Sequence, residues 1–220
     1  MVQKVTTNRL SSSQFFSQGA KKKNQIVLHH TAGSHRADWV ISGWEATPAV
    51  VGTPFIIGGL DTQGSDKDKM NGVVYEAFPD TGWAWSLAVT SSNRTALEKG
   101  NVGIEMTNYG YVVPNKEGKF ISYVGREIHP SQVVELSKPF KGYKFWHKYT
   151  DLQLESAYKL IKEQQEKWGM VWPKKKWTPE LFERSNEALS GQTGVFVHSN
   201  YAAKFDCSPQ PRLIEMLNSL

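Results

Sequence analysis

The sequence predicts a single α/β (α+β) domain in which a central mixed β-sheet is flanked by helices. Short β-rich runs alternate along the chain with stretches of helical periodicity, and such patterns build sheets covered by helices. The chain has 220 residues, of which 39% are hydrophobic and 12% aromatic. This is enough to bury one sizeable core. We therefore expect one globular domain over 25–220, preceded by an N-terminal arm over 1–24 that is rich in Ser, Thr and Gln.

The predicted sheet is built from β-rich runs separated by polar segments. In the run over 101–110, Val102 and Ile104 should face one side of the sheet, because successive side chains of a strand alternate. Glu105 then faces the other side. A short strand late in the chain delivers His198 at its end. The runs are 25–30, 53–59, 72–78, 101–110 and 194–200, and a polar hairpin connection joins the second to the third.

The clearest helix covers 150–169. Thr150 and Gln153 fit a capping box at its start, and Gly169 suits the position just after its end. Its apolar stripe indicates ordinary core packing. Two further helices are predicted from a cap followed by proline at the first helical position, and they begin at Thr178–Pro179 and at Ser208–Pro209.

The charge pattern argues against nucleic acid as a partner. The formal net charge is +5, but the basic residues are scattered, with short lysine runs only at 21–23 and 174–176. A mild positive charge instead suits encounter with an anionic polymer. The chain has no run of about 18 apolar residues that would predict a membrane span. It has one cysteine, which excludes an intrachain disulfide.

Histidines, together with an acid and a thiol near the C-terminus, predict a metal site. Histidine is the commonest metal ligand, and a catalytic zinc site combines three protein ligands with one open position. Only one of His29 and His30 can face a given site, since neighbouring side chains of a strand point to opposite faces. Cys207 is a small hydrophobe, a reactive thiol or a ligand. The candidates are His29, His30, His35, His129, His147, His198, Asp206 and Cys207.

Four ordered segments carry a resemblance to a known family. "IVLHHTAG", "TPFII", "NVGIEMTNYG" and "HSNYAAKFDCSP", at these separations, resemble the zinc-dependent N-acetylmuramoyl-L-alanine amidases of type 2. That group includes the phage-type lysozyme amidases and the peptidoglycan recognition proteins. The resemblance runs from about residue 25 to the C-terminus, and only part of the family has a region like 111–149. It implies an amidase catalytic domain over 25–220 with an amidase- and peptidoglycan recognition protein-like fold.

The resemblance also implies the ligands of a Zn²⁺ cofactor. His29 matches the first histidine ligand and His198 the second. The third ligand in the family is Cys or Asp, close after a lysine. Lys204 stands two residues before Asp206 and three before Cys207, and this spacing favours Asp206.

The implied reaction is hydrolysis of the amide bond between N-acetylmuramic acid and L-alanine of the peptidoglycan stem. Glu105 matches the family's general base, and Lys204 its basic residue that stabilises the oxyanion. Many relatives have a tyrosine near the metal where this chain has Thr53–Pro54, so more of the proton transfer is left to Glu105. Candidate substrate-binding residues are Thr31, Trp83, Trp85 and Asn108.

The alternative is a non-catalytic protein of the same fold that binds peptidoglycan or muropeptides. Such relatives lack part of the ligand set, whereas this chain has all of it, so we favour an enzyme of the bacteriolytic, endolysin type. An unrelated metalloprotease is not favoured, because the chain has no HExxH motif. The N-terminal region has no apolar core of a signal peptide. We therefore expect a protein that is cytoplasmic as synthesised and acts on the cell wall after release or export by another route.

Overall fold

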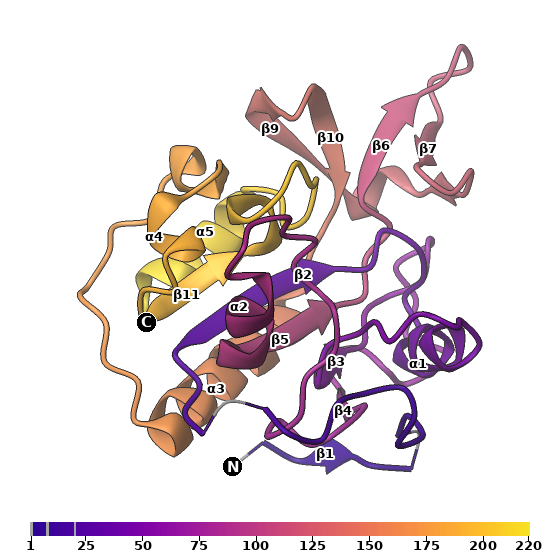
Figure 1. Ribbon diagram of the computed structural model, residues 1–220. Coiled ribbons are helices and arrows are strands. Elements are labelled where there is room, and N and C mark those ends of the chain that lie inside the picture. Colours follow the sequence, from indigo (N-terminus) through magenta and orange to yellow (C-terminus); the bar gives the residue numbers. More distant parts are fainter. Residues whose placement is uncertain (1, 8, 20) are drawn as a thin grey trace.

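The first sheet of the molecule has six strands in the order β1-β4-β3-β5-β2-β11 (Figure 1). The computed structural model describes residues 2–7, 9–19 and 21–220. Strands β3 and β4 are antiparallel and all other neighbours are parallel, so the sheet is mixed. The strands are β1 (Lys4–Val5), β2 (Gln25–His30), β3 (Phe55–Ile57), β4 (Val74–Glu76), β5 (Asn101–Met106) and β11 (Gly194–Val197).

Alternation along β2 and β5 gives the sheet two buried faces with different neighbours. Leu28 and Ile104 belong to the main core, which includes residues of α3 (Asp151–Trp168) and α5 (Pro211–Asn218). Val27, one residue from Leu28, packs instead in a cluster with Leu97 of α2 (Arg94–Gly100). The predicted orientation of Val102 and Ile104 is confirmed, because both lie in the main core. His29 and Glu105, which alternate with these core residues and pair across the two strands, lie on the opposite face of the sheet.

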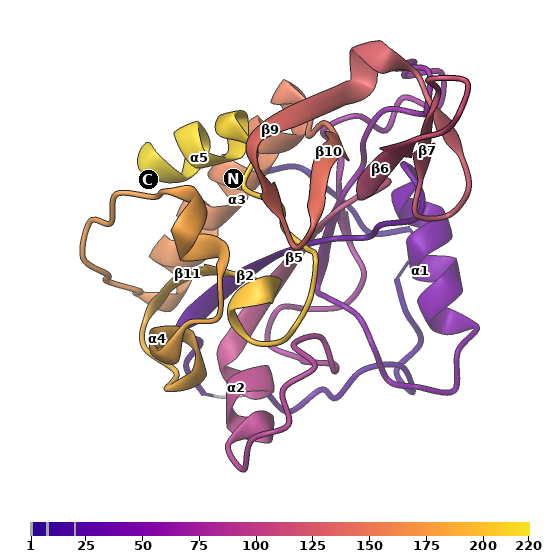
Figure 2. The ribbon, with the colours of Figure 1, turned by 90° about the horizontal axis from the view of Figure 1, so that it is seen from above.

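Helices cover both faces of the first sheet (Figures 1 and 2). Helix α3 has the predicted capping box between Thr150 and Gln153, and Gly169 ends it in the left-handed conformation with φ 58°. On the other face, Ile41 of α1 (Ala37–Glu45) packs with Ile56 of β3. The predicted fold, a central mixed sheet flanked by helices, is confirmed.

The residues over 111–147 form a second, antiparallel sheet. Its order is β8-β7-β6-β10-β9, and it projects beyond the first sheet (Figures 1 and 2). The chain enters it at Gly110, where φ is 73° and a Cβ atom would lie 3.1 Å from the Cβ of Ala32. Glycine is thus required at this turn. The strands are β6 (Tyr111–Pro114), β7 (Phe120–Ser122), β8 (Glu127–Ile128), β9 (Val133–Phe140) and β10 (Tyr143–His147), with a 3₁₀ turn η1 (Pro130–Gln132).

Two predicted helices differ from the structure. The segment over 178–189 forms a 3₁₀ turn, η2 (Pro179–Phe182), and a short helix, α4 (Asn186–Leu189). The Asn200 side chain donates hydrogen bonds to the carbonyls of Leu181 and Glu183 at 2.8 and 2.6 Å, which diverts them from a helical ladder. Helix α5 begins at Pro211 rather than after Ser208. Pro211 disfavours the helical conformation of Gln210, the residue before it, which is extended.

The described part of the N-terminal arm lies against the first sheet. Strand β1 pairs with the edge strand β4, and Leu10 is buried in the cluster with Ile41 and Ile56. No helix within the described residues is long and apolar enough to cross a membrane.

Candidate metal centre

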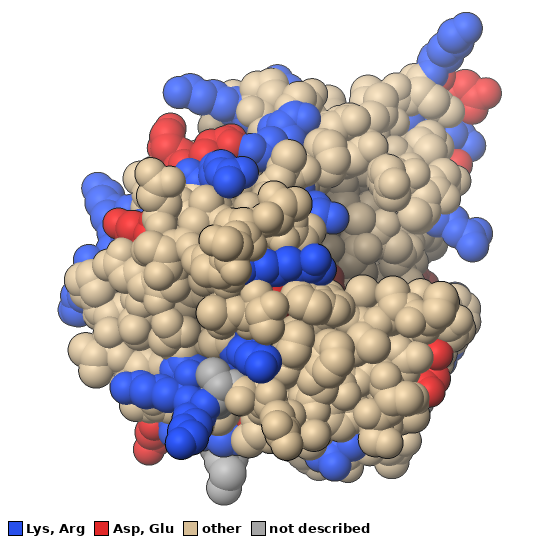
Figure 3. All heavy atoms as spheres, in the orientation of Figure 1, with Lys and Arg blue, Asp and Glu red and all other residues tan. Residues whose placement is uncertain are grey.

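A cleft of about 760 Å³ lies at the carboxyl ends of the parallel strands β2 and β5. This end of an open α/β sheet is where ligands bind. The surface is hollowed between the part over α1 and the part over the second sheet, and Lys and Arg atoms are spread over this face (Figure 3). The cleft is lined by His29, Glu105, His198, Lys204 and Asp206, by 31–34 and 51–53, and by residues of α1 and of 85–94.

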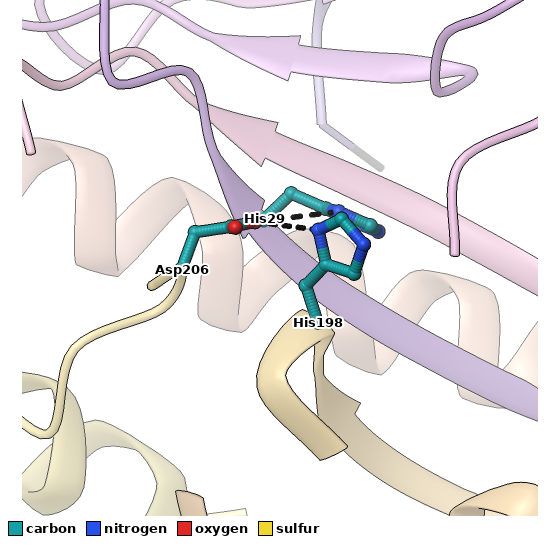
Figure 4. Close-up of side chains that lie close together, drawn as sticks. All are labelled: His29, His198 and Asp206. Atoms are coloured by element: carbon teal, nitrogen blue, oxygen red, sulfur yellow. Dashed lines mark hydrogen bonds and ion pairs between the residues drawn. The ribbon is translucent and has the colours of Figure 1, made fainter. Parts of the chain in front are cut away.

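Two histidines and an aspartate meet in this cleft (Figure 4). Oδ2 of Asp206 lies 2.9 Å from Nδ1 of His198 and 3.6 Å from Nδ1 of His29. The two imidazole rings are 4.5 Å apart between centroids. One ligand atom of each of the three residues lies within 4.8 Å of the others. The cluster therefore has the size of a metal site.

The strand arrangement explains how residues so far apart in sequence come together. His29 is the fifth residue of β2, and β11 runs parallel beside β2. His198, which follows β11 at the start of the 3₁₀ turn η3 (His198–Asn200), therefore lies against His29. The backbone N–H of Ser199 donates to the carbonyl of Asp206 at 2.9 Å and closes the loop that returns Asp206 to the pair.

The chemistry of the three side chains fits a bound zinc ion. Nδ1 of His29 and Nδ1 of His198 both face one atom, Oδ2 of Asp206. The donor atoms of the three side chains therefore converge on one place, as the ligands of a metal ion do. Two imidazole nitrogens and one carboxylate oxygen form a donor set that suits zinc, with room for a fourth ligand.

Asp206 and Cys207 point to different environments. Asp206 lies in the cluster, whereas the Cys207 side chain is fully buried in the main core. Burial raises the pKa of the Cys207 thiol well above its usual value, which disfavours the thiolate that binds metals. Of the two candidates, only Asp206 is placed to bind the same ion as His29 and His198.

The charges of the cluster favour a neutral His29 imidazole beside an ionised Asp206 carboxylate. Burial, together with the neighbouring His198, lowers the pKa of His29 to about 4. Burial alone would raise the pKa of Asp206, but the adjacent imidazoles, His198 first, outweigh it and hold that pKa well below its usual value. Metal ligands must be in these deprotonated forms.

Glu105 is the neighbour of His29 across two strands. The register of β2 and β5 pairs His29 with Glu105, so their side chains share one face of the sheet. Glu105 is 8% exposed and lines the cleft. Burial, reinforced by the Asp206 carboxylate, raises its pKa well above the usual value. A carboxyl group with a raised pKa beside a metal cluster suits general acid–base chemistry.

The other predicted site residues divide into two groups. Lys204, Thr31 and Trp85 line the cleft, as does Thr53. Trp83 lies outside the cleft lining, 7% exposed, and stacks on Phe16. Asn108 is fully buried, and its side chain donates to the carbonyls of 147 and 148. We therefore propose no substrate contact for Trp83 or Asn108.

Several solved structures share this architecture. The N-acetylmuramoyl-L-alanine amidase LysC from Clostridium intestinale superposes with a TM-score of 0.52 at 12% identity, over 100% of this chain and 97% of that chain. The catalytic domain of XlyA gives 0.51 at 12% identity, over 94% of this chain and 90% of that chain. AmpDh3 from Pseudomonas aeruginosa gives 0.52 at 16% identity, over 100% and 65% respectively. The sequence matches no family model and no curated protein.

The chain has the type 2 amidase fold. At these identities the likeness concerns the fold, and it confirms the fold that the sequence motifs predict. Any function of this type 2 amidase fold in the present chain rests on the geometry of its own cleft.

Hydrogen bonds of Tyr149 support the cleft of this type 2 amidase fold, and the sequence did not predict them. Tyr149 links the strand of the first histidine to the loop of the aspartate, because its hydroxyl bonds Nδ1 of His30 at 2.7 Å and accepts from the backbone N–H of Ser208 at 3.2 Å. Gln210 accepts from the N–H of Tyr149 and donates to the Ser208 hydroxyl. The linkage runs between elements, so no local sequence pattern signals it.

His147, also beneath the cleft, predicts acid sensitivity of the fold. Burial, then His30 and His35, lowers its pKa from 6.5 to about 3. Between pH 6.5 and about 3, His147 is therefore protonated in the unfolded chain and neutral in the folded chain. The free energy of unfolding should fall as pH drops below about 6.5 toward 3, at up to about 1.4 kcal/mol per pH unit for one proton.

Denaturant unfolding between pH 7 and pH 4 tests this expectation. In His147→Gln the slope of unfolding free energy against pH should decrease by up to about 1.4 kcal/mol per pH unit, which corresponds to one proton. His129→Gln, at an exposed histidine, serves as the control and should keep the wild-type slope. Equal slopes in wild type and His147→Gln would contradict the prediction.

Proposed function

We propose that this chain is a zinc-dependent N-acetylmuramoyl-L-alanine amidase, with 25–220 as its catalytic domain. The observation that supports this best is the cluster of His29, His198 and Asp206, with Glu105 beside it on the same face of the sheet. The substrate is bacterial peptidoglycan or muropeptide, and the bond cleaved is the amide between N-acetylmuramic acid and L-alanine. The amidase and endolysin folds that resemble this chain favour the same reaction.

The three clustered side chains would hold the zinc ion. When bound, zinc would lower the pKa of water to about 7 and polarise the scissile carbonyl. His29 and His198 would contribute imidazole nitrogens, and Asp206 would contribute its carboxylate. The Tyr149 hydroxyl fixes the segment after Asp206 from below by its bond with the N–H of Ser208.

Glu105 would transfer the proton. Its carboxylate accepts a proton from the attacking water and passes it to the nitrogen of the departing L-alanine. The raised pKa of Glu105 suits both steps, because an acid of ordinary pKa would hold the proton too weakly to deliver it near neutral pH. Thr53–Pro54, which stands where many relatives have a tyrosine, offers no second group to transfer the proton.

Lys204 would oppose the negative charge of the tetrahedral oxyanion. Its side chain is partly buried and lines the cleft two residues before Asp206. A fixed positive charge aimed at the developing oxyanion stabilises the transition state more than the substrate.

Digestion of purified peptidoglycan tests the proposed function. Mass spectrometry should find free lactyl groups on the glycan and new L-alanine amino termini. Activity should be lost on chelation and return with about one zinc per chain. New reducing sugar ends would indicate a glycosidase, and full activity in the metal-free protein would exclude the mechanism. Binding of peptidoglycan by the zinc-loaded protein without cleavage would identify a receptor.

Lys204→Ala should lower kcat by about two to three orders of magnitude, as loss of a single oxyanion donor does. KM should change little, because the charge acts mainly in the transition state. Lys22→Ala is the control, since it removes one lysine outside the cleft lining. A Lys204→Ala enzyme with unchanged kcat would assign oxyanion stabilisation elsewhere.

A further inference from the structure

An aromatic cluster joins the second sheet to the loop of the metal centre. We call it the aromatic platform, and it consists of Tyr111, Tyr123, Tyr143 and Phe205. Tyr111 stacks on Tyr143 with ring centroids 3.5 Å apart, and Tyr123 meets Tyr111 edge-on at 5.6 Å. Phe205 lies 5.6 Å from Tyr111 and 5.7 Å from Tyr143. Three strand regions and the catalytic loop thus contribute to one surface feature.

The aromatic platform reaches solvent and borders the cleft. Tyr123 is 63% exposed and Phe205 is 40% exposed. Large aromatic side chains gathered on a surface mark sites of binding. Phe205 stands between Lys204 and Asp206, both of which line the cleft. The segment that precedes α5 runs beside β10 in both ribbon views (Figures 1 and 2). The platform is therefore continuous with the candidate metal centre.

Two surfaces that differ in their charged groups extend from the metal centre. The cleft runs toward α1 and carries the charged side chains of Arg94 and Lys204 along its lining. The platform adjoins Asp206 through Phe205, and it consists of tyrosine and phenylalanine side chains. The proposed substrate likewise has two parts, a stem peptide with ionised groups and a glycan strand of largely neutral sugar rings. The neutral platform matches the glycan.

We propose that the aromatic platform binds N-acetylhexosamine rings of the glycan strand next to the cleavage point. This inference rests on the proposed amidase function. A pyranose ring presents a flat face of C–H groups that packs against an aromatic ring, while tyrosine hydroxyls can bond the sugar hydroxyls at the rim. The second sheet would then serve to hold the polymer, with the hydrolytic groups on the first sheet.

Binding of chitotetraose, the soluble tetramer of N-acetylglucosamine, tests the platform directly. The zinc-loaded protein should bind it, as measured by NMR titration. Tyr123→Ser should weaken the affinity by about fivefold, the size expected for one aromatic contact. Tyr123→Phe, which keeps the ring, should stay within about twofold of wild type. Val124→Ser alters the adjacent apolar side chain, which is 44% exposed, and should have no effect.

Kinetics separate this inference from the proposed function. Tyr123→Ser should raise KM on polymeric peptidoglycan about fivefold. On muramyl dipeptide, which has a single sugar and lacks the neighbouring rings of the strand, the same variant should raise KM less than it does on polymeric peptidoglycan. If no substrate is cleaved but chitotetraose binding depends on the ring of residue 123, the sugar-binding role of the platform is supported and the proposed amidase function is contradicted.

Other outcomes would overturn the platform while leaving the amidase intact. These are no chitotetraose binding by the wild type, or equal binding by wild type and Tyr123→Ser. A dimer detected by analytical ultracentrifugation that dissociates in Tyr123→Ser, with sugar binding unchanged, would show instead that the platform joins two copies of the chain.

Discussion

Asp206→Ala is expected to lose zinc and hydrolytic activity together, whereas Cys207→Ser keeps both. Asp206 lies 2.9 Å from His198 and completes the three-residue cluster, while the Cys207 side chain is buried in the main core. Loss of a direct ligand should lower zinc affinity by more than the about 10- to 100-fold that a supporting residue costs. Zinc content by elemental analysis and amide hydrolysis by mass spectrometry measure the two effects.

Stability measurements show whether these variants still fold. Cys207→Ser introduces a hydroxyl into an apolar core and should lower the unfolding free energy by about 1–3 kcal/mol without loss of zinc. Asp206→Ala should keep its far-UV circular dichroism spectrum, since the backbone bond from Ser199 to residue 206 does not need the side chain. Zinc lost in Cys207→Ser and kept in Asp206→Ala would reverse the assignment of the third ligand.

The elements that could be predicted are those with a local cause. Helix α3 is specified by a capping box at Thr150 and a glycine at 169, and both act where the sequence shows them. The strand positions of His29 and Glu105 follow from alternation, which also placed Val102 and Ile104 in the core. Local chemistry therefore set the elements that position the candidate site.

The features that could not be predicted depend on contacts between distant segments. Asn200 breaks the helix expected over 178–189 by bonding the carbonyls of Leu181 and Glu183 from another element. Helices α1 and α2 were missed, since α1 begins without a side-chain cap at Arg36 and α2 without one at Asn93. Tyr149 supports the cluster only because β2 and the loop before α5 meet over it.

The metal cluster lies between these two cases. The spacing to Lys204, as the family resemblance has it, favoured Asp206 over Cys207, although thiolate is a good zinc ligand. The distances follow from the parallel pairing of β2 with β11, which brings His198 to His29 across about 170 residues of chain. That pairing is a property of the whole sheet and has no local signature.

Glu105→Gln is expected to keep zinc and fold while kcat falls by about two to four orders of magnitude, the usual contribution of a positioned acid or base. The substitution preserves shape, and glutamine is neutral, as a protonated Glu105 would be. Glu105 also lies outside the cluster of possible ligands among the described residues. Zinc content and thermal unfolding should therefore match the wild type.

The pH dependence of the rate distinguishes proton transfer by Glu105 from a structural role. Because burial and the Asp206 carboxylate raise its pKa well above 4.5, the acid limb of the kcat/KM profile should lie above pH 4.5 in the wild type. This limb should disappear from the residual activity of Glu105→Gln. Glu98→Gln is the matched control, because Glu98 is also buried but accepts from the N–H groups of Ser86 and Leu87 outside the cluster. It should lower the melting temperature and keep the acid limb. Near wild-type kcat in Glu105→Gln, with zinc bound, would assign the proton transfer to another group.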